Sequence, residues 1–250
     1  MKGKPARKRL DLLLVERGLA ESRQKAQAMI LAGEVQINGT RAEKAGQLVA
    51  QNAGIQVHSR LQKYASRGGL KLESALEEFG IDPAGRVCLD VGASTGGFTD
   101  CLLQRGAARV YAVDVTTNQL AWKLQQDPRV IRIEKNAREL TPADIPGPID
   151  LVVVDVSFIS TAKVLGPVAA AARPGADLLI LVKPQFELDR GEVGSGGIVR
   201  EPGLHDKAIA RVRQAAKHIG LEDCGVLPSR LTGAEGNQEF FLHARRKPVE

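Results

Sequence analysis

The chain has 250 residues, of which 43% are hydrophobic and 26% charged, and its formal net charge at pH 7 is +6. This composition is ordinary for a globular protein of one or two domains. The longest apolar run, residues 176–182, is interrupted by Asp177 and falls far short of the roughly 18 residues of a membrane span. Three cysteines without a CxxC spacing argue against a disulfide framework or a metal site, and they suit the reducing cytoplasm.

The positive charge is concentrated in the first part of the chain. Residues 1–67 contain 13 lysines and arginines and 5 acidic residues, a net charge of +8, whereas the remaining residues have a net charge of −2. A basic segment joined to a nearly neutral body of enzyme size is typical of an attached module that binds a polyanion. The charge alone fits a solvated basic face equally well, so the motifs must decide.

Residues 9–60 are predicted to form a small domain of two helices and short strands. Leucines at helical spacing indicate a first helix that begins near Leu10 and stops at Gly18, and Ser22 can cap a second helix that stops at Gly33. Alternating apolar residues then indicate short strands, with Asn38-Gly39 as a tight hairpin turn. This order of elements and turn residues resembles the S4 RNA-binding domain.

Residues 61–67 are predicted to be a linker, and a helix with an apolar stripe follows them. Lys71 lies off that stripe near the helix start, where a cation gains nothing from the helix dipole. The preceding pair Gly68-Gly69 lets another group approach closely. Because helix stability does not explain Lys71, this residue is a candidate for function.

The most informative stretch is D-V-G-A-S-T-G-G-F-T-D, residues 90–100, between an apolar strand and a helix. A glycine-rich turn at this place in an open α/β sheet lies outside the carboxyl end of the first strand, where ligands bind. Many such turns are only connections, but a nucleotide-type cofactor is the natural occupant. The predicted contacts are Gly92, Ala93, Ser94, Thr95, Gly96 and Gly97.

Polar residues also follow the other apolar strands of the larger domain. The predicted strands end at Asp114 with Val115 beside it, at Asn136, at Asp155 and at Lys183, and Glu239 begins the last strand. Because the carboxyl ends of parallel strands share one edge of a sheet, we expect the glycine-rich turn, Asp114, Asp155 and Lys183 to lie close together. An acid about 20 residues after the glycine-rich turn can bond a cofactor ribose, which favours Asp114 for that role.

Together these motifs resemble the TlyA proteins, which are also named hemolysin A and join an S4 domain to a methyltransferase domain of the FtsJ type. The resemblance covers the chain from Arg9 to about Arg245. In the small domain it rests on RLDLLLVERGL (9–19), SRQKA (22–26), ILAGEV (30–35) and NG (38–39). In the large domain it rests on SRGGLKL (66–72), DVGASTGGFTD (90–100), DLVVVDVSFIS (150–160), LVKPQFE (181–187) and GNQEF (236–240).

The resemblance implies an α/β fold: a Rossmann-like class I methyltransferase domain over residues 68–250, with a mostly parallel seven-stranded sheet, and an S4-type α+β domain over residues 1–60. It implies S-adenosylmethionine as the cofactor, held by the glycine-rich turn and by Asp114, Val115, Asn136 and Asp155. The implied reaction is 2′-O-methylation of a cytidine in ribosomal RNA, on the small ribosomal subunit, the large one or both, without a metal or a membrane.

The resemblance also assigns individual residues. The Lys-Asp-Lys-Glu tetrad of the family corresponds to Lys71, Asp155, Lys183 and Glu239. RNA contacts are expected from Arg9, Arg23, Gln24, Lys25 and Arg67. One segment departs from the family, because residues 113–120 read V-D-V-T-T-N-Q-L where relatives have glycines after the acid. Asn118 can adopt left-handed backbone, but Thr116 and Thr117 tolerate it poorly, so the sequence leaves the geometry of the adenosine pocket open.

The tetrad makes chemical sense without the family name. A ribose 2′-hydroxyl needs proton removal and in-line placement against an electrophilic methyl group. A lysine can act as the base in its neutral form, which desolvation and nearby cations favour, and Lys183 is the candidate. Asp155 would orient Lys183, while Lys71 and Glu239 would hold the ribose. The alternative is a buried ion-pair network that serves structure alone.

Other functions would leave other signals in the sequence. Methylation of an exocyclic amine favours an Asn/Asp-Pro-Pro-aromatic turn, whereas residues 155–158 read D-V-S-F, and no cysteine is placed as a nucleophile for methylation at cytosine C5. A dinucleotide dehydrogenase would have no use for the tetrad. An RNA-binding assembly factor with a vestigial methyltransferase fold stays open, and a membrane-active cytolysin is suggested only by the hemolysin name.

Overall fold

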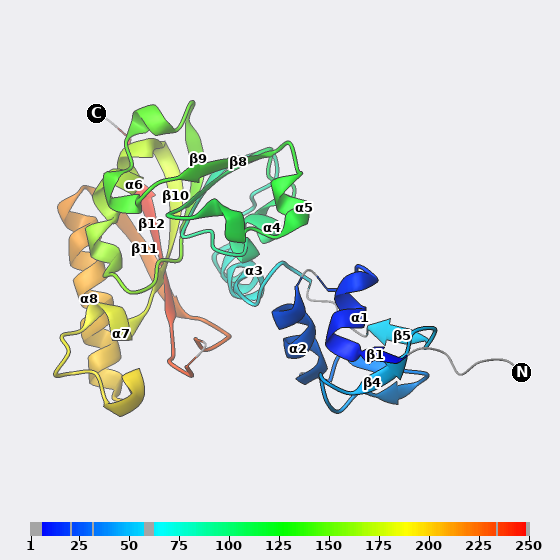
Figure 1. Cartoon of the computed structure of the whole chain (residues 1–250). Helices are drawn as coiled ribbons and strands as arrows, with labels where there is room; N and C mark the ends of the chain where they lie inside the picture. The colour runs from blue at the N-terminus through cyan, green and yellow to red at the C-terminus, as the bar shows by residue number, and fades with distance from the viewer. Residues whose placement is uncertain (1–6, 21, 32, 58–62, 234, 249–250) are drawn as a thin grey trace, which may run out of the picture. The chain divides into compact units, whose positions relative to one another are not determined.

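The computed structural model describes residues 7–20, 22–31, 33–57, 63–233 and 235–248. The chain divides into two compact units, Met1–Gln62 and Lys63–Glu250 (Figure 1). Each unit buries hydrophobic residues of its own, so each has the core that an independent domain requires.

The N-terminal unit packs two helices against short strands. The helices are α1 (Leu10–Glu16) and α2 (Arg23–Leu31), and the strands are β1 (Arg7–Arg9), β2 (Val35–Ile37), β3 (Thr40–Arg41), β4 (Leu48–Ala50) and β5 (Ile55–Val57). β1 pairs with β4, and β2 lies between β3 and β5 in a second antiparallel sheet. Leu10, Leu14 and Ile30 are buried because they share the inward faces of α1 and α2.

The predicted cap and turn of this unit are confirmed. The Ser22 hydroxyl accepts a hydrogen bond from the Lys25 N–H at 3.2 Å and so satisfies a free donor at the start of α2. Asn38 and Gly39, with φ of 49° and 83°, join β2 to β3 in the tight turn whose twist matches a hairpin.

The larger unit is built on a seven-stranded sheet of order β11-β12-β10-β9-β6-β7-β8. Its strands are β6 (Val87–Val91), β7 (Arg109–Asp114), β8 (Val130–Glu134), β9 (Ile149–Val154), β10 (Ala172–Val182), β11 (Leu221–Pro228) and β12 (Phe240–Arg246). The pairs among β6 to β10 are parallel, whereas β12 pairs antiparallel with both β10 and β11. The mostly parallel sheet that we predicted is therefore confirmed.

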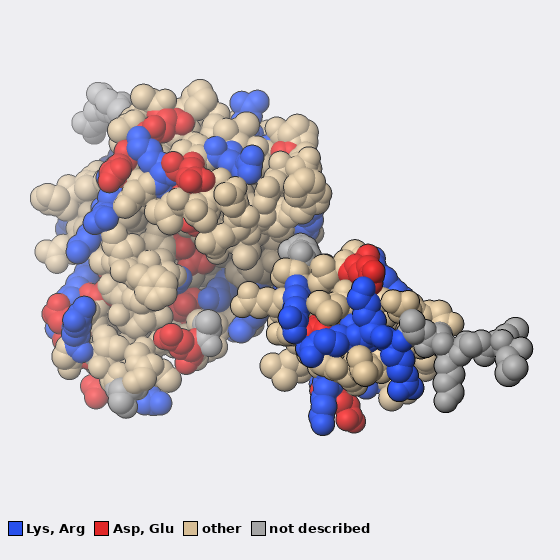
Figure 2. Space-filling model, in the orientation of Figure 1, with Lys and Arg blue, Asp and Glu red and all other residues tan. Residues whose placement is uncertain are grey.

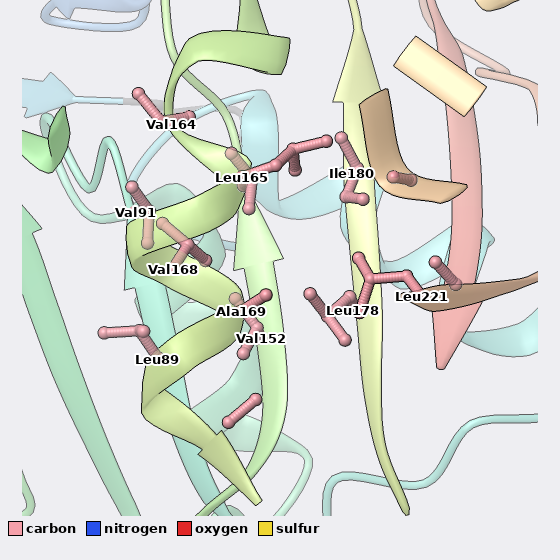
Figure 3. Packing of buried hydrophobic residues seen from close by; sticks show 14 of the residues in the cluster. Leu89, Val91, Val152, Val164, Leu165, Val168, Ala169, Leu178, Ile180 and Leu221 are labelled. Atoms are coloured by element: carbon pink, nitrogen blue, oxygen red, sulfur yellow. The ribbon is translucent and has the colours of Figure 1, made fainter. Parts of the chain in front are cut away.

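Helices cover both faces of this sheet. They are α3 (Gly68–Phe79), α4 (Gly97–Gln104), α5 (Trp122–Gln125), α6 (Leu165–Ala171), α7 (Pro184–Glu187) and α8 (Pro202–His218), with 3-10 turns η1 (Thr117–Gln119), η2 (Ala137–Glu139), η3 (Pro142–Asp144), η4 (Thr161–Lys163) and η5 (Ser195–Gly197). Alternate residues of a strand point to opposite faces. Leu89 and Val91 accordingly lie in the cluster with α6 (Figure 3), and Cys88 lies in the cluster with α3 and α4. Coverage of both faces explains why the central strands are almost continuously apolar.

The segment predicted to be a linker differs from the expectation. Residues 61–62 lie outside the described residues, but residues 63–67 belong to the larger unit. Tyr64 is buried and its hydroxyl donates to Glu73 Oε1 at 2.7 Å, while the Ala65 N–H donates to the Asp100 carboxylate at 2.7 Å. Burial of an aromatic ring and two hydrogen bonds to α3 and α4 fix this segment, which a free linker would not show.

Prolines lie at or near two element boundaries of the larger unit. β10 begins at Ala172, before Pro174-Gly175, and its register with β9 shifts between Ala172 and Asp177. The irregularity accommodates the residues that weaken a regular ladder. α8 begins at Pro202, because proline is favourable in the first turn of a helix.

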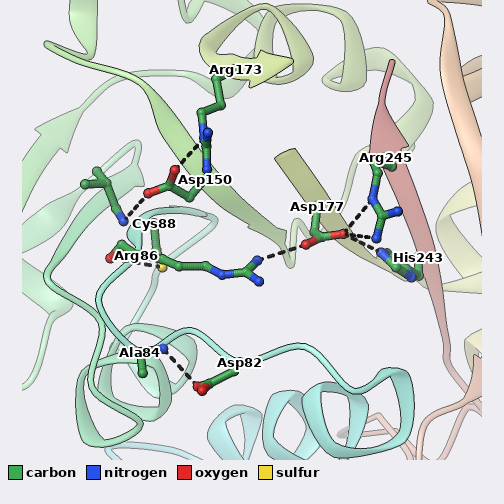
Figure 4. Close-up of polar contacts among 10 residues, drawn as sticks. Asp82, Ala84, Arg86, Cys88, Asp150, Arg173, Asp177, His243 and Arg245 are labelled. Carbon is green, nitrogen blue, oxygen red and sulfur yellow. Dashed lines mark hydrogen bonds and ion pairs between the residues drawn. The ribbon is translucent and has the colours of Figure 1, made fainter. Parts of the chain in front are cut away.

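A buried ion network joins the central strands near their amino ends (Figure 4). Asp177 of β10 accepts hydrogen bonds from His243 Nε2 at 2.9 Å, Arg86 Nη1 at 2.8 Å and Arg245 Nη2 at 3.0 Å. Burial alone would raise the pKa of this carboxyl, but the three donors outweigh burial and hold the pKa well below its usual range. The network links β10, β12 and the start of β6.

Asp177→Asn is expected to lower the free energy of unfolding of the larger unit by about 1.5–3 kcal/mol at pH 7, the range for hydrogen bonds to charged groups. Because the folded-state pKa of Asp177 is depressed, its stabilisation is present above about pH 4, the unfolded value, and is lost as the pH falls further. Urea unfolding followed by circular dichroism should show a wild-type advantage that shrinks between pH 7 and pH 3. Asp127→Asn, which removes a more exposed pair with Arg129, is the control and should change stability by less than about 1 kcal/mol. Equal losses in the two variants would contradict this account.

Candidate active site

The glycine-rich turn lies between β6 and α4, where strand ends approach too closely for a side chain. A Cβ at Gly92, whose φ is 88°, would come within 2.3 Å of the Asp155 carbonyl oxygen. The Gly92 N–H donates to the Val113 carbonyl at 2.9 Å, and the Ser94 N–H donates to Asp114 Oδ2 at 2.8 Å. These contacts tie the ends of β6, β7 and β9 together at the edge where the sequence predicted a site.

A buried carboxyl supports the turn from the sheet. Asp90 of β6 is fully buried, and its Oδ2 accepts a hydrogen bond from the Thr99 hydroxyl of α4 at 2.6 Å. Burial, opposed by this hydrogen bond, raises the pKa of Asp90 to about 7. The bond joins the strand before the turn to the helix after it, so it fixes both ends of the turn.

A cavity of about 350 Å³ adjoins the turn beside β7 and β9, a volume within the range of small-molecule sites. Of the predicted cofactor-binding residues, it is lined by Gly92, Ser94, Asp114, Val115, Asn136 and Asp155. Ala93, Thr95 and Gly97 line a neighbouring cavity instead. Gly96 lines neither, because the space where its side chain would stand is filled by Leu124 of α5.

Residues 116–118, which read T-T-N where the family has G-x-G, are not strained. Thr116 is extended, with φ of −147°, and Thr117 begins η1. The buried Thr117 hydroxyl donates to Glu134 Oε2 at 3.3 Å. Among the described non-glycine residues, positive φ occurs only at Asn38, Ser94 and Phe158. This segment therefore contains no left-handed residue, and the loss of the glycines does not strain its backbone.

Two lysine–carboxylate pairs lie beside the turn. Lys183 Nζ lies 2.6 Å from Asp155 Oδ1 and donates to the Ser157 hydroxyl at 2.8 Å. Lys71 Nζ donates to Glu239 Oε2 at 2.5 Å. Lys71, Asp155 and Lys183 line one cavity of about 230 Å³, which shares Gly92, Ser94, Asp155 and Ser157 with the larger cavity. The structure thus brings together the four residues that the sequence nominated as catalytic.

The topology explains how residues so far apart in the sequence meet. Val182 at the end of β10 is paired with Phe240 at the start of β12. Because β12 is antiparallel to β10, the residue before it lies at the edge where the parallel strands end. Lys183 and Glu239 therefore flank one point of this edge, and Asp155 reaches it from β9.

Glu239 is held in place by the loop before β12. Gly233 leaves no room for a side chain, since a Cβ there would come within 2.7 Å of Glu239 Oε1. The buried Asn237 donates to the Gly197 carbonyl at 2.8 Å and accepts from the Val199 N–H at 2.8 Å. Asn237 thus fastens part of the long segment 184–202 to the loop that carries Glu239, which the sequence patterns do not indicate.

Phe158 is a second feature that sequence reasoning missed. This residue lines the larger cavity, is 91% exposed and has φ of 65°, an uncommon and strained conformation for an aromatic residue. Its ring contacts that of Phe186 at a centroid distance of 5.4 Å. The available signal was an aromatic residue three positions after a strand-ending acid, in D-V-S-F.

The predicted RNA contacts of the N-terminal unit lie on its surface, where Figure 2 shows lysine and arginine side chains gathered on the visible face. Arg9 and Arg23 both bond Asp11, whereas Gln24 and Lys25 are exposed. Arg67 belongs to the larger unit and lines the cavity that contains Lys71.

No group of three or more potential metal ligands occurs in the described part of the chain. Nor does that part contain a helix long and apolar enough to cross a membrane.

Family models match both units. The model of FtsJ-like methyltransferases matches residues 64–246, and the S4 domain model matches residues 8–55. The Mycobacterium tuberculosis 16S/23S rRNA (cytidine-2′-O)-methyltransferase TlyA is 49% identical over 96% of this chain and 90% of that protein. Hemolysin A of Brachyspira hyodysenteriae is 42% identical over 94% of this chain and 98% of that protein.

A solved structure agrees with these relatives. A Streptococcus thermophilus protein that carries a hemolysin name is 40% identical, with a TM-score of 0.76 over 99% of this chain and 90% of that one. The seven-stranded sheet with one antiparallel strand is the class I methyltransferase fold that the sequence predicted. The chain is therefore a methyltransferase that belongs to the FtsJ-like family, and within it to the TlyA proteins with an N-terminal S4 domain.

Proposed function

We propose that the chain transfers a methyl group from S-adenosylmethionine to the 2′-hydroxyl of a cytidine in ribosomal RNA, on the small ribosomal subunit, the large one or both. The main support for this proposal is the Lys183–Asp155 pair, which lies with the Lys71–Glu239 pair at a cavity that adjoins the glycine-rich turn. The activity for which the Mycobacterium tuberculosis relative is named and the match to the S4 model support this choice of substrate.

The residues of the larger cavity fit the cofactor. Gly92 keeps the space beside the Asp155 carbonyl free of a side chain, and Asp114 presents a carboxylate at the end of β7, where a ribose hydroxyl can donate to it. Asn136 lines the same cavity at the end of β8, near the expected adenine position. When bound, S-adenosylmethionine supplies an electrophilic methyl group, and the protein must supply placement and proton removal.

Lys183 is the group that we assign to proton removal. Asp155 and Ser157 hold its Nζ at 2.6 and 2.8 Å, so the amine has a fixed position in the cavity. As an ammonium paired with Asp155 it cannot accept a proton, so it must be neutral when the 2′-hydroxyl arrives. The proton then moves from the hydroxyl oxygen to Lys183 Nζ. Lys71 and Glu239 offer a donor and an acceptor for the ribose.

Phe158 supports a nucleic-acid substrate. Its exposed, strained ring lines the larger cavity, beside the smaller one that contains the two lysines; it contributes little to the core, but it offers a flat face for a base. Enzymes that act on a structured RNA need to hold the target nucleotide apart from its neighbours. The contact with Phe186 braces the ring against α7, so the platform is already formed before RNA binds.

Asp114→Ala is expected to weaken S-adenosylmethionine binding by about 10- to 100-fold, the loss of a hydrogen bond to a charged acceptor. The variant also removes the acceptor for the Ser94 N–H, so the turn loses one of its fixed points. Isothermal calorimetry with the cofactor measures the change, and Asp127→Ala, outside both cavities, is the matched control. An unchanged affinity would place the ribose elsewhere.

The proposed function is tested by methyl transfer to purified ribosomal subunits. Small and large subunits lacking the modification are incubated separately with the protein and methyl-labelled S-adenosylmethionine. We expect label in the RNA of at least one subunit, and nuclease digestion should release it as 2′-O-methylcytidine. Label on a base, or no label on either subunit with a protein that binds the cofactor, would refute the proposal. The second result would favour an assembly factor.

A further inference from the structure

The N-terminal unit contains a buried carboxylate that the proposed RNA contacts do not by themselves explain. Asp11 in the first turn of α1 is 0% exposed, although an aspartate is rarely buried unless it is paired. Its side-chain partners lie on two other elements, Arg9 on β1 and both Arg23 and Gln27 on α2, and the neighbouring Leu12 N–H also donates to it. Hydrogen bonds from Arg9 foremost, and from Gln27 and Arg23, hold the pKa of Asp11 well below its usual range despite its burial, so it remains ionised.

The geometry of the cluster fixes two arginines. Arg9 donates two hydrogen bonds to the Asp11 carboxylate, from Nε at 3.0 Å and from Nη2 at 2.8 Å. Arg23 donates from Nε at 3.0 Å. Each guanidinium has five N–H donors, so after these bonds three remain on Arg9 and four on Arg23. Both side chains stay partly open to solvent, 42% and 54% exposed, so these remaining donors can reach a ligand.

We propose that Asp11 is a positioning residue for RNA binding: it sets Arg9 and Arg23 as a rigid pair of guanidinium forks for the phosphate backbone of the RNA. Planar forks match phosphate oxygens in a bidentate manner, which lysine cannot do. A long side chain that is already ordered loses less conformational freedom on binding. This inference rests on the proposed RNA substrate, and it adds Gln27, which the sequence analysis did not single out, to the cluster that supports the RNA face.

The inference predicts a change in RNA affinity that is opposite in sign to the change expected from net charge alone. Asp11→Asn raises the net charge of a basic unit by one, which alone should strengthen its attraction to a polyanion. If Asp11 orders the two arginines, the variant should instead bind RNA about 5- to 100-fold more weakly, the factor for ordering two long side chains at binding. The matched control is Glu16→Gln, the same charge change at an exposed pair with Lys8, which should bind equally well or more tightly.

The experiment uses the full-length protein and protein-free large-subunit ribosomal RNA, with filter binding over a salt series. Log affinity falls as log salt rises, and this dependence should be less steep for Asp11→Asn. The magnitude of the slope should decrease by about 0.7 for each RNA phosphate that the variant no longer neutralises. Circular dichroism and cofactor calorimetry report whether each unit remains folded. Asp11→Asn that binds as tightly as Glu16→Gln, with an unchanged slope, would overturn the inference.

A second variant keeps the test decisive if Asp11→Asn does not fold. The double change Arg9→Lys and Arg23→Lys preserves every charge but removes the forks, so RNA binding should weaken to a similar degree. Arg7→Lys, outside the cluster, should have no effect, and equal affinity of both lysine variants would overturn the inference. Because binding is measured without turnover, a protein that transfers no methyl group but shows these losses would refute the proposed function and leave this inference intact.

Discussion

Lys183→Ala is expected to lower the single-turnover rate of methyl transfer by about 10²–10⁴-fold, the usual contribution of a general base. Cofactor affinity and RNA affinity should remain close to those of the wild type, because Lys183 lines only the smaller cavity beside the glycine-rich turn. The reason is chemical: the variant lacks the amine that we assign to take the proton of the 2′-hydroxyl, and Lys71 in the same cavity is paired with Glu239 instead. Lys217→Ala, an exposed lysine in the last turn of α8, is the control and should leave the rate unchanged.

Lys183→Arg separates proton removal from the provision of positive charge. Arginine keeps the cation near Asp155 but cannot give up its proton under working conditions. If Lys183 is the base, the arginine variant should be as slow as the alanine variant, and the rising limb of the wild-type pH–rate profile should be missing from both. Substantial activity in Lys183→Arg, or a flat wild-type profile, would show that the lysine only holds the ribose by its charge.

A chain that begins at Lys63 is expected to lose most of its affinity for ribosomal RNA while it still binds S-adenosylmethionine. The larger unit has its own core and contains both cavities, whereas the basic surface lies on the unit that is removed. If the removed unit binds about 6–10 phosphates, the full-length protein should weaken about 10³–10⁵-fold between 50 and 200 mM salt. The truncated protein should show a much flatter response.

The position of this truncation is important. Tyr64 and Ala65 are bonded to α3 and α4, so a cut after residue 67 would remove part of the larger unit and confuse loss of RNA binding with loss of structure. Cofactor calorimetry on the truncated chain provides the necessary control. Undiminished methylation of ribosomal subunits by a chain that begins at Lys63 would contradict an RNA-binding role for the N-terminal unit.

Local sequence patterns predicted most of the fold. Apolar runs that end in a polar residue identified β6, β7, β9 and β10, because parallel strands covered on both faces leave a clear signal. The pairing of β12 between β10 and β11 was not predictable in this way, since an antiparallel insertion depends on register and not on composition. The fixed segment 63–67 was also missed, because the burial of Tyr64 depends on α3 and α4.

Local patterns likewise predicted the part of the site that lies at the ends of strands, but not the part that depends on tertiary contacts. Residues that end strands, such as Asp114 and Lys183, could be placed at one edge from the chain order alone. The partner of Lys71 lies 168 residues away and was assigned only through the family resemblance. Phe158 and Asp11 were missed, because a positive φ and a buried carboxylate arise from tertiary surroundings that no short pattern records.

The antiparallel last strand links catalysis to the order in which the molecule is made. Chains fold from the N-terminus as they are synthesised, so α3 with Lys71 and the five parallel strands emerge well before β12. Until β12 inserts, β10 is an open edge with unpaired N–H and C=O groups, and Lys71 lacks its carboxylate. When β12 pairs with β10, it covers this edge and brings Glu239 next to Lys71. On the proposed role of Glu239, methyl transfer can therefore begin only after the sheet is complete.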